Sequence, residues 1–370
     1  MDDAVEVDGS ILEGGGQVLR NCAAYAAILG KSVHFVKIRA NRPKPGLRPQ
    51  HLEGLRLASE VTNGTLMNAN ENSQDVWFTP GQLLTGDPQM LSYSEVTRHV
   101  ADTKTAGSCS LLLQVCLPIL LFAPNNSELV LKGGTNVSFS PPIDYTKHVL
   151  VPLIQKHFGV TVDIEIVRRG FMPRGGGIIN VKIQPAKLLP PIHMVDRGII
   201  VSITAKLYGF GNTDQQFMDS VKVSVANMLQ ENGIDVKVKF EYDMQGLETK
   251  SKLVCGLFLH AESSTGCIFG GGSLAGHNSK PERLVYLAIK DLVKQLSDGG
   301  CTDEYLQDQL IIFMVLATGV SEIMTGPITV HTETAIYFAH HMTNAKITVT
   351  PITGSLRNLI RCQGIGHTPQ

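Results

Sequence analysis

The chain has 370 residues, of which 43% are hydrophobic and 18% are charged, and its formal net charge is −1. A chain of this length and composition can bury a large core and form more than one domain, so a disordered or basic-tail protein is excluded. Because the net charge is close to zero, any polyanionic partner has to be bound by a local cluster of cations.

The cysteines and the apolar runs indicate an intracellular protein without a membrane partner. The seven cysteines contain no CxxC pair, which favours reduced thiols. The acidic start of the chain lacks the apolar segment of a secretion signal, and the longest apolar run, residues 111–122, is about half as long as a membrane-spanning helix.

The first elements alternate between strands and helices. Residues 5–7 and 33–38 predict strands, and the helix between them follows a run of three glycines. Backbone N–H groups in such a turn can close on an anion, with Glu13, Gln17 and Arg20 around the same turn. A plain tight turn is an equally good interpretation of the glycines.

An arginine-rich loop follows the second strand. It holds six cations and one acid, Glu53, and its prolines and glycine keep it extended until Pro49 starts a helix. Arginine side chains at this density suit a terminal phosphate and the backbone behind it, although a solvated loop is the alternative. The cations are Lys37, Arg39, Arg42, Lys44, Arg48 and Arg56.

The middle of the chain continues the alternation, and residues 81–105 carry no assignable pattern. Strands are predicted at 128–131, 160–167 and 178–183, with helices from Ser108 and over 144–157. Gln114 is the one strongly polar side chain in the first of these apolar helices. A buried amide needs partners, so Gln114 is either a structural tie or a ligand contact.

A proline-rich segment near residue 188 predicts a domain boundary. The following strands and helix suggest a small βαββ insertion that ends in a loop at 270–281, after which a helix over 282–296 returns to the core. We therefore expect residues 1–187 and 286–370 to form a core of repeated units, and residues 188–285 to form an inserted domain. The insertion is predicted from strands at 199–208, 236–242 and 253–261 and a helix at 214–230.

The stretch after residue 301 carries the strongest candidate chemistry. Thr302 predicts the cap of a buried helix that ends before Gly319. Tyr305, Asp308 and Gln309 lie at i, i+3 and i+4 and therefore share one face of this apolar helix. A polar face in apolar surroundings is costly unless it binds something.

A histidine follows a short β-branched run. Residues 327–330 predict a strand that ends at His331, immediately before a helix that Thr332 opens. The positive end of a helix favours the neutral imidazole, which would leave a nucleophilic nitrogen for phosphoryl or nucleotidyl attack. A hydrogen-bonded bystander is the alternative for this histidine.

Several of these motifs together resemble those of RNA 3′-terminal phosphate cyclases, and the similarity spans nearly the whole chain. The resemblance implies an α/β (α+β) fold, with repeated βαβαββ units like the C-terminal domain of translation initiation factor 3 and a smaller inserted α/β domain. The motifs are EGGGQ at 13–17, IRANRPKPGLRPQHL at 38–52, TAGSCSLLLQ at 105–114, RGFMPRGGG at 169–177, DEYLQDQ at 303–309 and TGPITVH at 325–331.

The resemblance also implies a reaction. His331 would take AMP from ATP, with Mg²⁺ or Mn²⁺ present, and pass it to an RNA 3′-terminal phosphate, which then closes to a 2′,3′-cyclic phosphate. It places around the nucleotide Gln114, Pro141, Tyr305, Asp308 and Gln309. It places around the RNA phosphate Glu13, Arg20, Arg39, Arg42 and Gln50. It implies a nuclear location, with the cytoplasm as an alternative, and it names neither metal ligands nor an oligomeric state.

Two other function classes share features with this chain. Non-catalytic cyclase-like proteins of ribosome assembly resemble the fold but lack the nucleophilic histidine. Carboxyvinyl transferases of similar fold lack the stretches at 169–177 and 303–309. Two departures from the cyclase pattern are a longer segment at 81–102 and Asn41, which replaces a glycine of many members.

Overall fold

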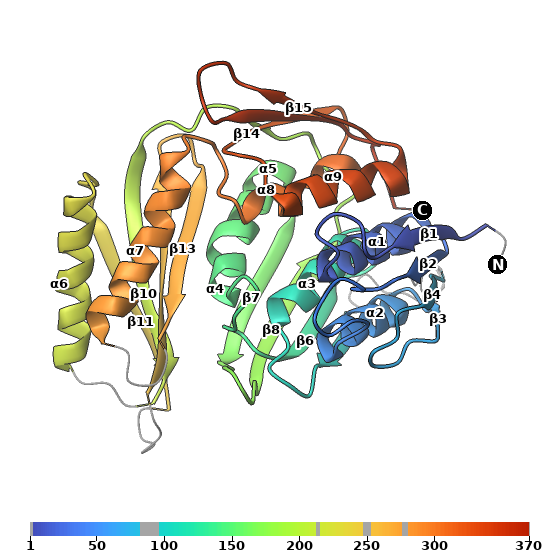
Figure 1. Ribbon diagram of the computed structural model, residues 1–370, viewed down its shortest axis with the longest axis horizontal. Coiled ribbons are helices and arrows are strands. Elements are labelled where there is room, and N and C mark those ends of the chain that lie inside the picture. Colours follow the sequence, from blue (N-terminus) through green and yellow to red (C-terminus); the bar gives the residue numbers. More distant parts are fainter. Residues whose placement is uncertain (1–2, 82–95, 212–214, 247–252, 276–279, 370) are drawn as a thin grey trace.

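The computed structural model describes residues 3–81, 96–211, 215–246, 253–275 and 280–369 (Figure 1). Within these residues, no helix is long and apolar enough to cross a membrane. The segment 82–95, which covers most of the longer stretch noted in the sequence, lies outside the described residues.

The chain builds the same βαβαββ unit three times. The first unit forms a four-stranded sheet in the order β1-β2-β4-β3, in which β1 and β2 are parallel and the other neighbours are antiparallel. Its elements are β1 (Val5–Asp8), α1 (Gly16–Leu29), β2 (Val33–Val36), α2 (Pro49–Val61), β3 (Thr65–Met67) and β4 (Val76–Thr79).

The second unit repeats this order as β5-β6-β8-β7, again with one parallel pair. Its second helix is composite, because a π-helical turn (Thr146–Leu150) joins α4 (Ile143–Tyr145) to α5 (Val151–Phe158). The other elements are β5 (Thr97–Asp102), α3 (Cys109–Leu120), β6 (Ser127–Gly133), β7 (Thr161–Arg168) and β8 (Gly177–Gln184).

The third unit is interrupted. Its sheet has the order β9-β14-β16-β15, but a second domain enters the chain between β9 and α8. The elements of this unit are β9 (His193–Met194), α8 (Leu306–Leu316), β14 (Val320–Thr325), α9 (Val330–Thr343), β15 (Lys346–Pro351) and β16 (Asn358–Gln363). The predicted fold class, a core of repeated βαβαββ units with a smaller insertion, is confirmed.

The inserted residues form a sheet of their own, in the order β11-β10-β12-β13, beside the core (Figure 1). Helix α7 packs against β12, β13 and the second helix α6. The division at residues 187/188 and 285/286 stays a prediction, and α7 spans its second boundary. The elements are β10 (Ile200–Phe210), α6 (Gln215–Glu231), β11 (Val238–Gln245), β12 (Val254–Ser263), β13 (Ile268–Leu274) and α7 (Pro281–Ser297).

The three core units meet through their helices. Helix α1 packs against α2, α3 and α9, and α8 packs against α3 and α9. These contacts bury large side chains, among them Tyr25, Leu112 and Phe338, which are all under 2% exposed. Helices α1, α2, α3 and α9 each come after a strand of a parallel pair, and ligands commonly bind at the carboxyl ends of such strands in α/β sheets. Side chains in the first turns of these helices therefore face a shared space.

Three local predictions are wrong. Helix α8 begins at Leu306, because Thr302 forms a bridge with Thr325 and the Asp303 carboxylate instead accepts the N–H of Leu306 at 2.8 Å. Residues 327–330 form no strand: the strand is β14, seven residues earlier, and α9 begins at Val330. The loop predicted at 270–281 contains most of β13, whose glycines allow a close approach to neighbouring groups.

Candidate active site

His331 lies in the first turn of α9, and not at the end of a strand. Thr329 caps this helix by accepting the N–H of Thr332 at 3.2 Å. The imidazole is exposed, and its Nδ1 atom lies 3.2 Å from the Oε1 atom of Gln17 in the first turn of α1. Gln17 in turn donates from Nε2 to the Oδ2 atom of Asp308 on α8, at 2.7 Å.

With Gln17 in this orientation, the two hydrogen bonds favour one tautomer of His331. Because the amide nitrogen of Gln17 donates to Asp308, its oxygen faces the imidazole, and an amide oxygen can only accept. The proton of a neutral His331 therefore resides on Nδ1, and Nε2 keeps its lone pair. The row of Asp308, Gln17 and His331 thus presents a nucleophilic nitrogen from the start of a helix.

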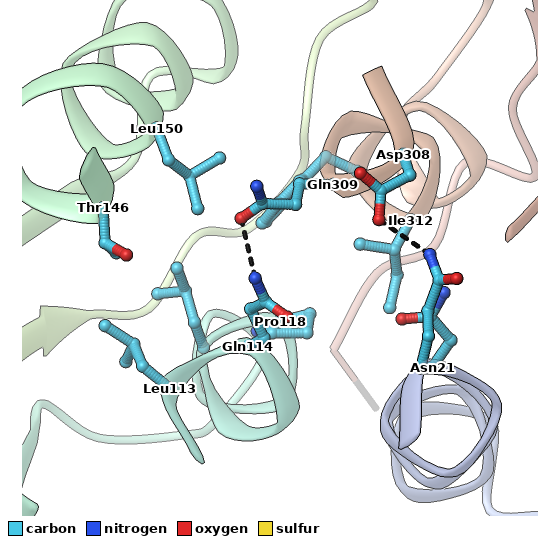
Figure 2. Close-up of a pocket in the computed structure, with 12 residues that line it drawn as sticks. Asn21, Leu113, Gln114, Pro118, Thr146, Leu150, Asp308, Gln309 and Ile312 are labelled. Atoms are coloured by element: carbon cyan, nitrogen blue, oxygen red, sulfur yellow. Dashed lines mark hydrogen bonds between the residues drawn. The ribbon is translucent and has the colours of Figure 1, made fainter. Parts of the chain in front are cut away.

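A pocket opens beside this row, and we call it the glutamine pocket (Figure 2). The Nε2 atom of Gln114 donates to the Oε1 atom of Gln309 at 2.9 Å, from α3 to α8. Three of the five residues expected around the nucleotide, Gln114, Asp308 and Gln309, therefore lie together. The pocket is lined by Gln17, Asn21, Leu113, Gln114, Leu117, Pro118, Thr146, Leu150, Asp308, Gln309, Ile312 and Phe313.

The other two expected nucleotide residues lie outside the lining of this pocket. Tyr305 is 38% exposed, and its hydroxyl donates to Asp291 of α7 at 3.0 Å. Pro141 is half-buried in the segment that precedes α4. The Nε2 atom of Gln309 donates to the backbone carbonyl oxygen of Tyr305, so the main chain of Tyr305 adjoins the Gln114–Gln309 hydrogen bond. The roles of Tyr305 and Pro141 around the nucleotide stay a prediction.

Burial changes the ionisation of the charged groups here. It raises the pKa of Asp308 to about 7, against the opposing influence of the nearby Arg20 guanidinium. It also lowers the pKa of Arg20 to about 10. Arg20 donates from Nε to the Oε1 atom of Gln114 at 3.1 Å. Arg20 therefore links the glutamine pocket to a second group of cations.

This second group, the arginine cluster, consists of Arg20, Arg39, Arg42 and Arg48 together with His51. Burial and the neighbouring guanidinium groups of Arg42 and Arg48 lower the pKa of Arg39. Arg39 donates to the carbonyl oxygens of its own loop, at 2.8 and 2.9 Å, and so holds that loop closed. Such mutual repulsion among cations is relieved when an anion binds between them.

Glu13 and Gln50 support the arginine cluster from two sides. Arg42 donates to the carboxylate and to the carbonyl oxygen of Glu13. The Oε1 atom of Gln50 accepts the N–H of Ser108 at 3.1 Å, and a small cavity lies between Gln50, Arg20 and His51. The structure therefore brings together all five residues that were expected around the RNA phosphate.

His51 is a group that the sequence did not single out, and Gln17 was expected only beside the glycine turn, without its bonds to His331 and Asp308. Burial, and then the charges of Arg39 and Arg20, lower the pKa of His51 to about 3. Its Nδ1 atom accepts the N–H of Arg48 at 3.1 Å, so Nε2 carries the proton. A Cβ atom at Gly16 would lie 2.5 Å from that Nε2 atom. His51 therefore presents an N–H group beside the glycine turn.

The described side chains of the site supply few ligands for a metal ion. The described residues contain no group of three or more His, Cys, Asp or Glu side chains that could hold one. Glu13 has one buried carboxylate oxygen, Oε2, without a partner among these residues. A magnesium ion usually keeps several waters and binds through one or two carboxylates and the phosphates of a nucleotide. Glu13 fits that limited role.

Comparison with known proteins agrees with the motifs. The model of the RNA 3′-terminal phosphate cyclase family matches residues 11–349. The chain belongs to this family. The match includes the glycine turn, the arginine loop and His331, so the family similarity covers the whole of the site described above.

Three relatives show the extent of the cyclase similarity. A probable RNA 3′-terminal phosphate cyclase of Dictyostelium discoideum is 39% identical over 98% of this chain and 83% of its own. The RNA 3′-terminal phosphate cyclase of Drosophila melanogaster is 36% identical over 98% of this chain and 97% of its own. The RNA 3′-terminal phosphate cyclase of Pyrobaculum aerophilum is 33% identical over 98% of this chain and 99% of its own length.

Proposed function

We propose that this protein uses ATP to convert an RNA 3′-terminal phosphate into a 2′,3′-cyclic phosphate. The observation that carries the proposal is the hydrogen-bonded row of Asp308, Gln17 and His331, which leaves the Nε2 atom of His331 free to attack. The names of the relatives support the RNA substrate. A nuclear location stays a prediction.

The first step joins AMP to the protein. His331 attacks the α-phosphate of ATP from Nε2, a phosphoramidate bond forms, and pyrophosphate leaves. As the ring gains positive charge, the proton on Nδ1 is held by Gln17, whose amide is oriented by Asp308. Magnesium, when bound, would offset charge on the departing pyrophosphate, with Glu13 as its protein ligand.

The next two steps take place at the arginine cluster. The RNA 3′-phosphate, held by Arg39, Arg42 and the N–H group of His51, attacks the AMP phosphorus and displaces Nε2 of His331. The neighbouring 2′-hydroxyl then attacks the activated 3′-phosphorus and releases its proton to solvent, and AMP leaves with the electrons of the broken P–O bond. This closure is intramolecular, so positioning supplies most of what it needs.

The test is to label the protein with ATP carrying a marked α-phosphate. His331→Asn should abolish the protein-bound label, whereas His340→Asn, an exposed histidine later on the same helix, should leave it unchanged. The bound AMP should be released by mild acid and survive alkali, because protonation of the imidazole makes it a good leaving group. A label that persists in His331→Asn would contradict the proposal, and so would a label absent from the wild type.

A further inference from the structure

The hydroxyl group of Thr146 is buried without a hydrogen-bond partner. Thr146 opens the π-helical turn between α4 and α5, and it is 1% exposed. Among the described residues, no group bonds to its Oγ1 atom. Almost all buried hydroxyl groups are paired, so an exception calls for an explanation.

Other helical threonines of this chain show what is unusual. Thr334 and Thr343 in α9, and Thr62 at the C-cap of α2, each donate from the hydroxyl to the carbonyl oxygen four residues earlier, at 2.6, 2.5 and 2.9 Å. This is the ordinary solution for a threonine inside a helix. Thr146 does not use it, although its backbone N–H reaches the carbonyl oxygen of Pro142 at 3.4 Å. π-helical turns are often found at functional sites.

The unpaired hydroxyl belongs to the lining of the glutamine pocket. Figure 2 shows Thr146 and Leu150 on the side of the pocket opposite Asp308, with Leu113 below them. Ile312 lies on the other side, beside Asp308. The far side of the pocket is therefore a largely apolar space with one free hydroxyl group, while the near side carries the amides and the carboxylate.

This distribution matches the parts of a nucleotide. His331 attacks at the α-phosphate, so the phosphates have to lie at the side of Gln17 and Asp308, and the sugar and base extend away from it. A flat apolar base with hydrogen-bonding atoms on its edge suits the opposite side. A hydroxyl can both donate and accept, so it can pair with a ring nitrogen or with an exocyclic amine.

We infer that Thr146 is a binding residue that recognises the purine base of the nucleotide through its hydroxyl group. The inference rests on the proposed use of ATP, and it adds a contact that selects the base. The paired variants are Thr146→Val, which keeps the shape and removes the hydroxyl, and Thr146→Ser, which keeps the hydroxyl.

The expected result separates binding from stability. Thr146→Val should raise KM for ATP in self-adenylylation by about three- to tenfold, the equivalent of one hydrogen bond, with kcat within about twofold. Thr146→Ser should stay close to the wild type. The urea midpoint of Thr146→Val without nucleotide should be equal or higher, because an unpaired buried hydroxyl has been removed. A structural role would instead lower the midpoint together with the affinity.

Base analogues identify the contact. With 1-deaza-, 3-deaza- and 7-deaza-ATP and purine riboside triphosphate, the difference between wild type and Thr146→Val should vanish for the analogue that lacks the bound atom. A difference that persists with all four would place the hydroxyl on the sugar or phosphate and overturn the inference. An unchanged KM in Thr146→Val would overturn it too. If the wild type accepts no label from ATP, the proposed function itself has failed.

Discussion

The Nδ1 atom of His331 lies 3.2 Å from the Oε1 atom of Gln17, and this hydrogen bond joins the third repeated unit to the first. The two residues are 314 positions apart in the chain. Their bond exists because α1 packs against α9. The repeated units therefore assemble one site at their common helices, and no unit contains it alone.

Gln17→Leu should slow self-adenylylation by about tenfold or more, which corresponds to about 1.4 kcal/mol in the barrier. The variant leaves Nδ1 of His331 without its acceptor, so the reactive tautomer is no longer favoured. The measurement is the single-turnover rate of label transfer from ATP. Asn21→Leu, one turn later in α1 and also in the pocket lining, is the control. Equal effects of the two variants would contradict the role of Gln17.

Arg42→Ala should impair the transfer of AMP to RNA much more than self-adenylylation. Its guanidinium belongs to the arginine cluster, and a lost charged hydrogen bond of about 1.5–3 kcal/mol slows that transfer by about 10- to 150-fold. The two steps are measured separately, the second from adenylylated protein prepared beforehand. Arg56→Ala removes an arginine that pairs with Glu53 outside the cluster, and it should affect neither step. Equal losses in both steps for Arg42→Ala would refute the assignment.

Asp308 should make the folded protein less stable as the pH rises from about 4 to about 7. Its pKa is about 7 in the folded protein, against a usual value of 3.8. Over this interval the folded protein holds a proton that the unfolded chain has released, so the free energy of unfolding falls with increasing pH. Above pH 7 the loss is complete.

Asp308→Asn removes this titration. The free energy of unfolding of the variant, relative to the wild type, should therefore increase between pH 4.5 and pH 7.5 in urea denaturation. Asp163→Asn, at an exposed position of β7, should show no such trend. If the free energy of unfolding of Asp308→Asn, relative to the wild type, fell over this interval, the prediction would be wrong. That result would mean that Arg20 and Gln17 stabilise the Asp308 carboxylate more than burial destabilises it.

The local elements could be predicted where one periodicity dominates. The helix that begins beside Ser108 and the strand Thr161–Arg168 were predicted within a residue or two, because their apolar spacing is unambiguous. The motifs also indicated His331, the arginine loop and the polar face of α8. Each of these signals lies within a short stretch of chain, where spacing and residue type carry the information.

The missed features depend on contacts between distant segments. Thr302 has the residue type of a helix cap, but its backbone pairs with Thr325, and tertiary pairing decides where α8 starts. Gln17 and Asp308 are 291 positions apart, so no local pattern could reveal their hydrogen bond. The run before His331 is β-branched, yet the cap at Thr329 starts a helix there. Residue type alone does not distinguish these outcomes.

Arg169 joins the core to the inserted sheet. Its guanidinium donates to both carboxylate oxygens of Asp144, at 2.7 and 2.9 Å, and to Asp243 of β11 at 3.0 Å. The side chains of Arg169 and Asp144 are both fully buried. Removing one partner of such a pair leaves the other charge uncompensated, which costs about 3–5 kcal/mol.

Arg169→Met should therefore lower the free energy of unfolding by about this amount in urea, while Arg168→Met, at the exposed neighbouring position, should change it by less than about 0.5 kcal/mol. The double variant Arg169→Met with Asp144→Leu should recover part of the loss, because it removes the fully buried carboxylate that Arg169 compensates, although Lys206 loses its ion pair with Asp144 at 3.9 Å. A double variant no more stable than Arg169→Met would show that the lost link to Asp243, and not the unpaired Asp144, accounts for the effect. A loss below about 1 kcal/mol in Arg169→Met would refute the prediction.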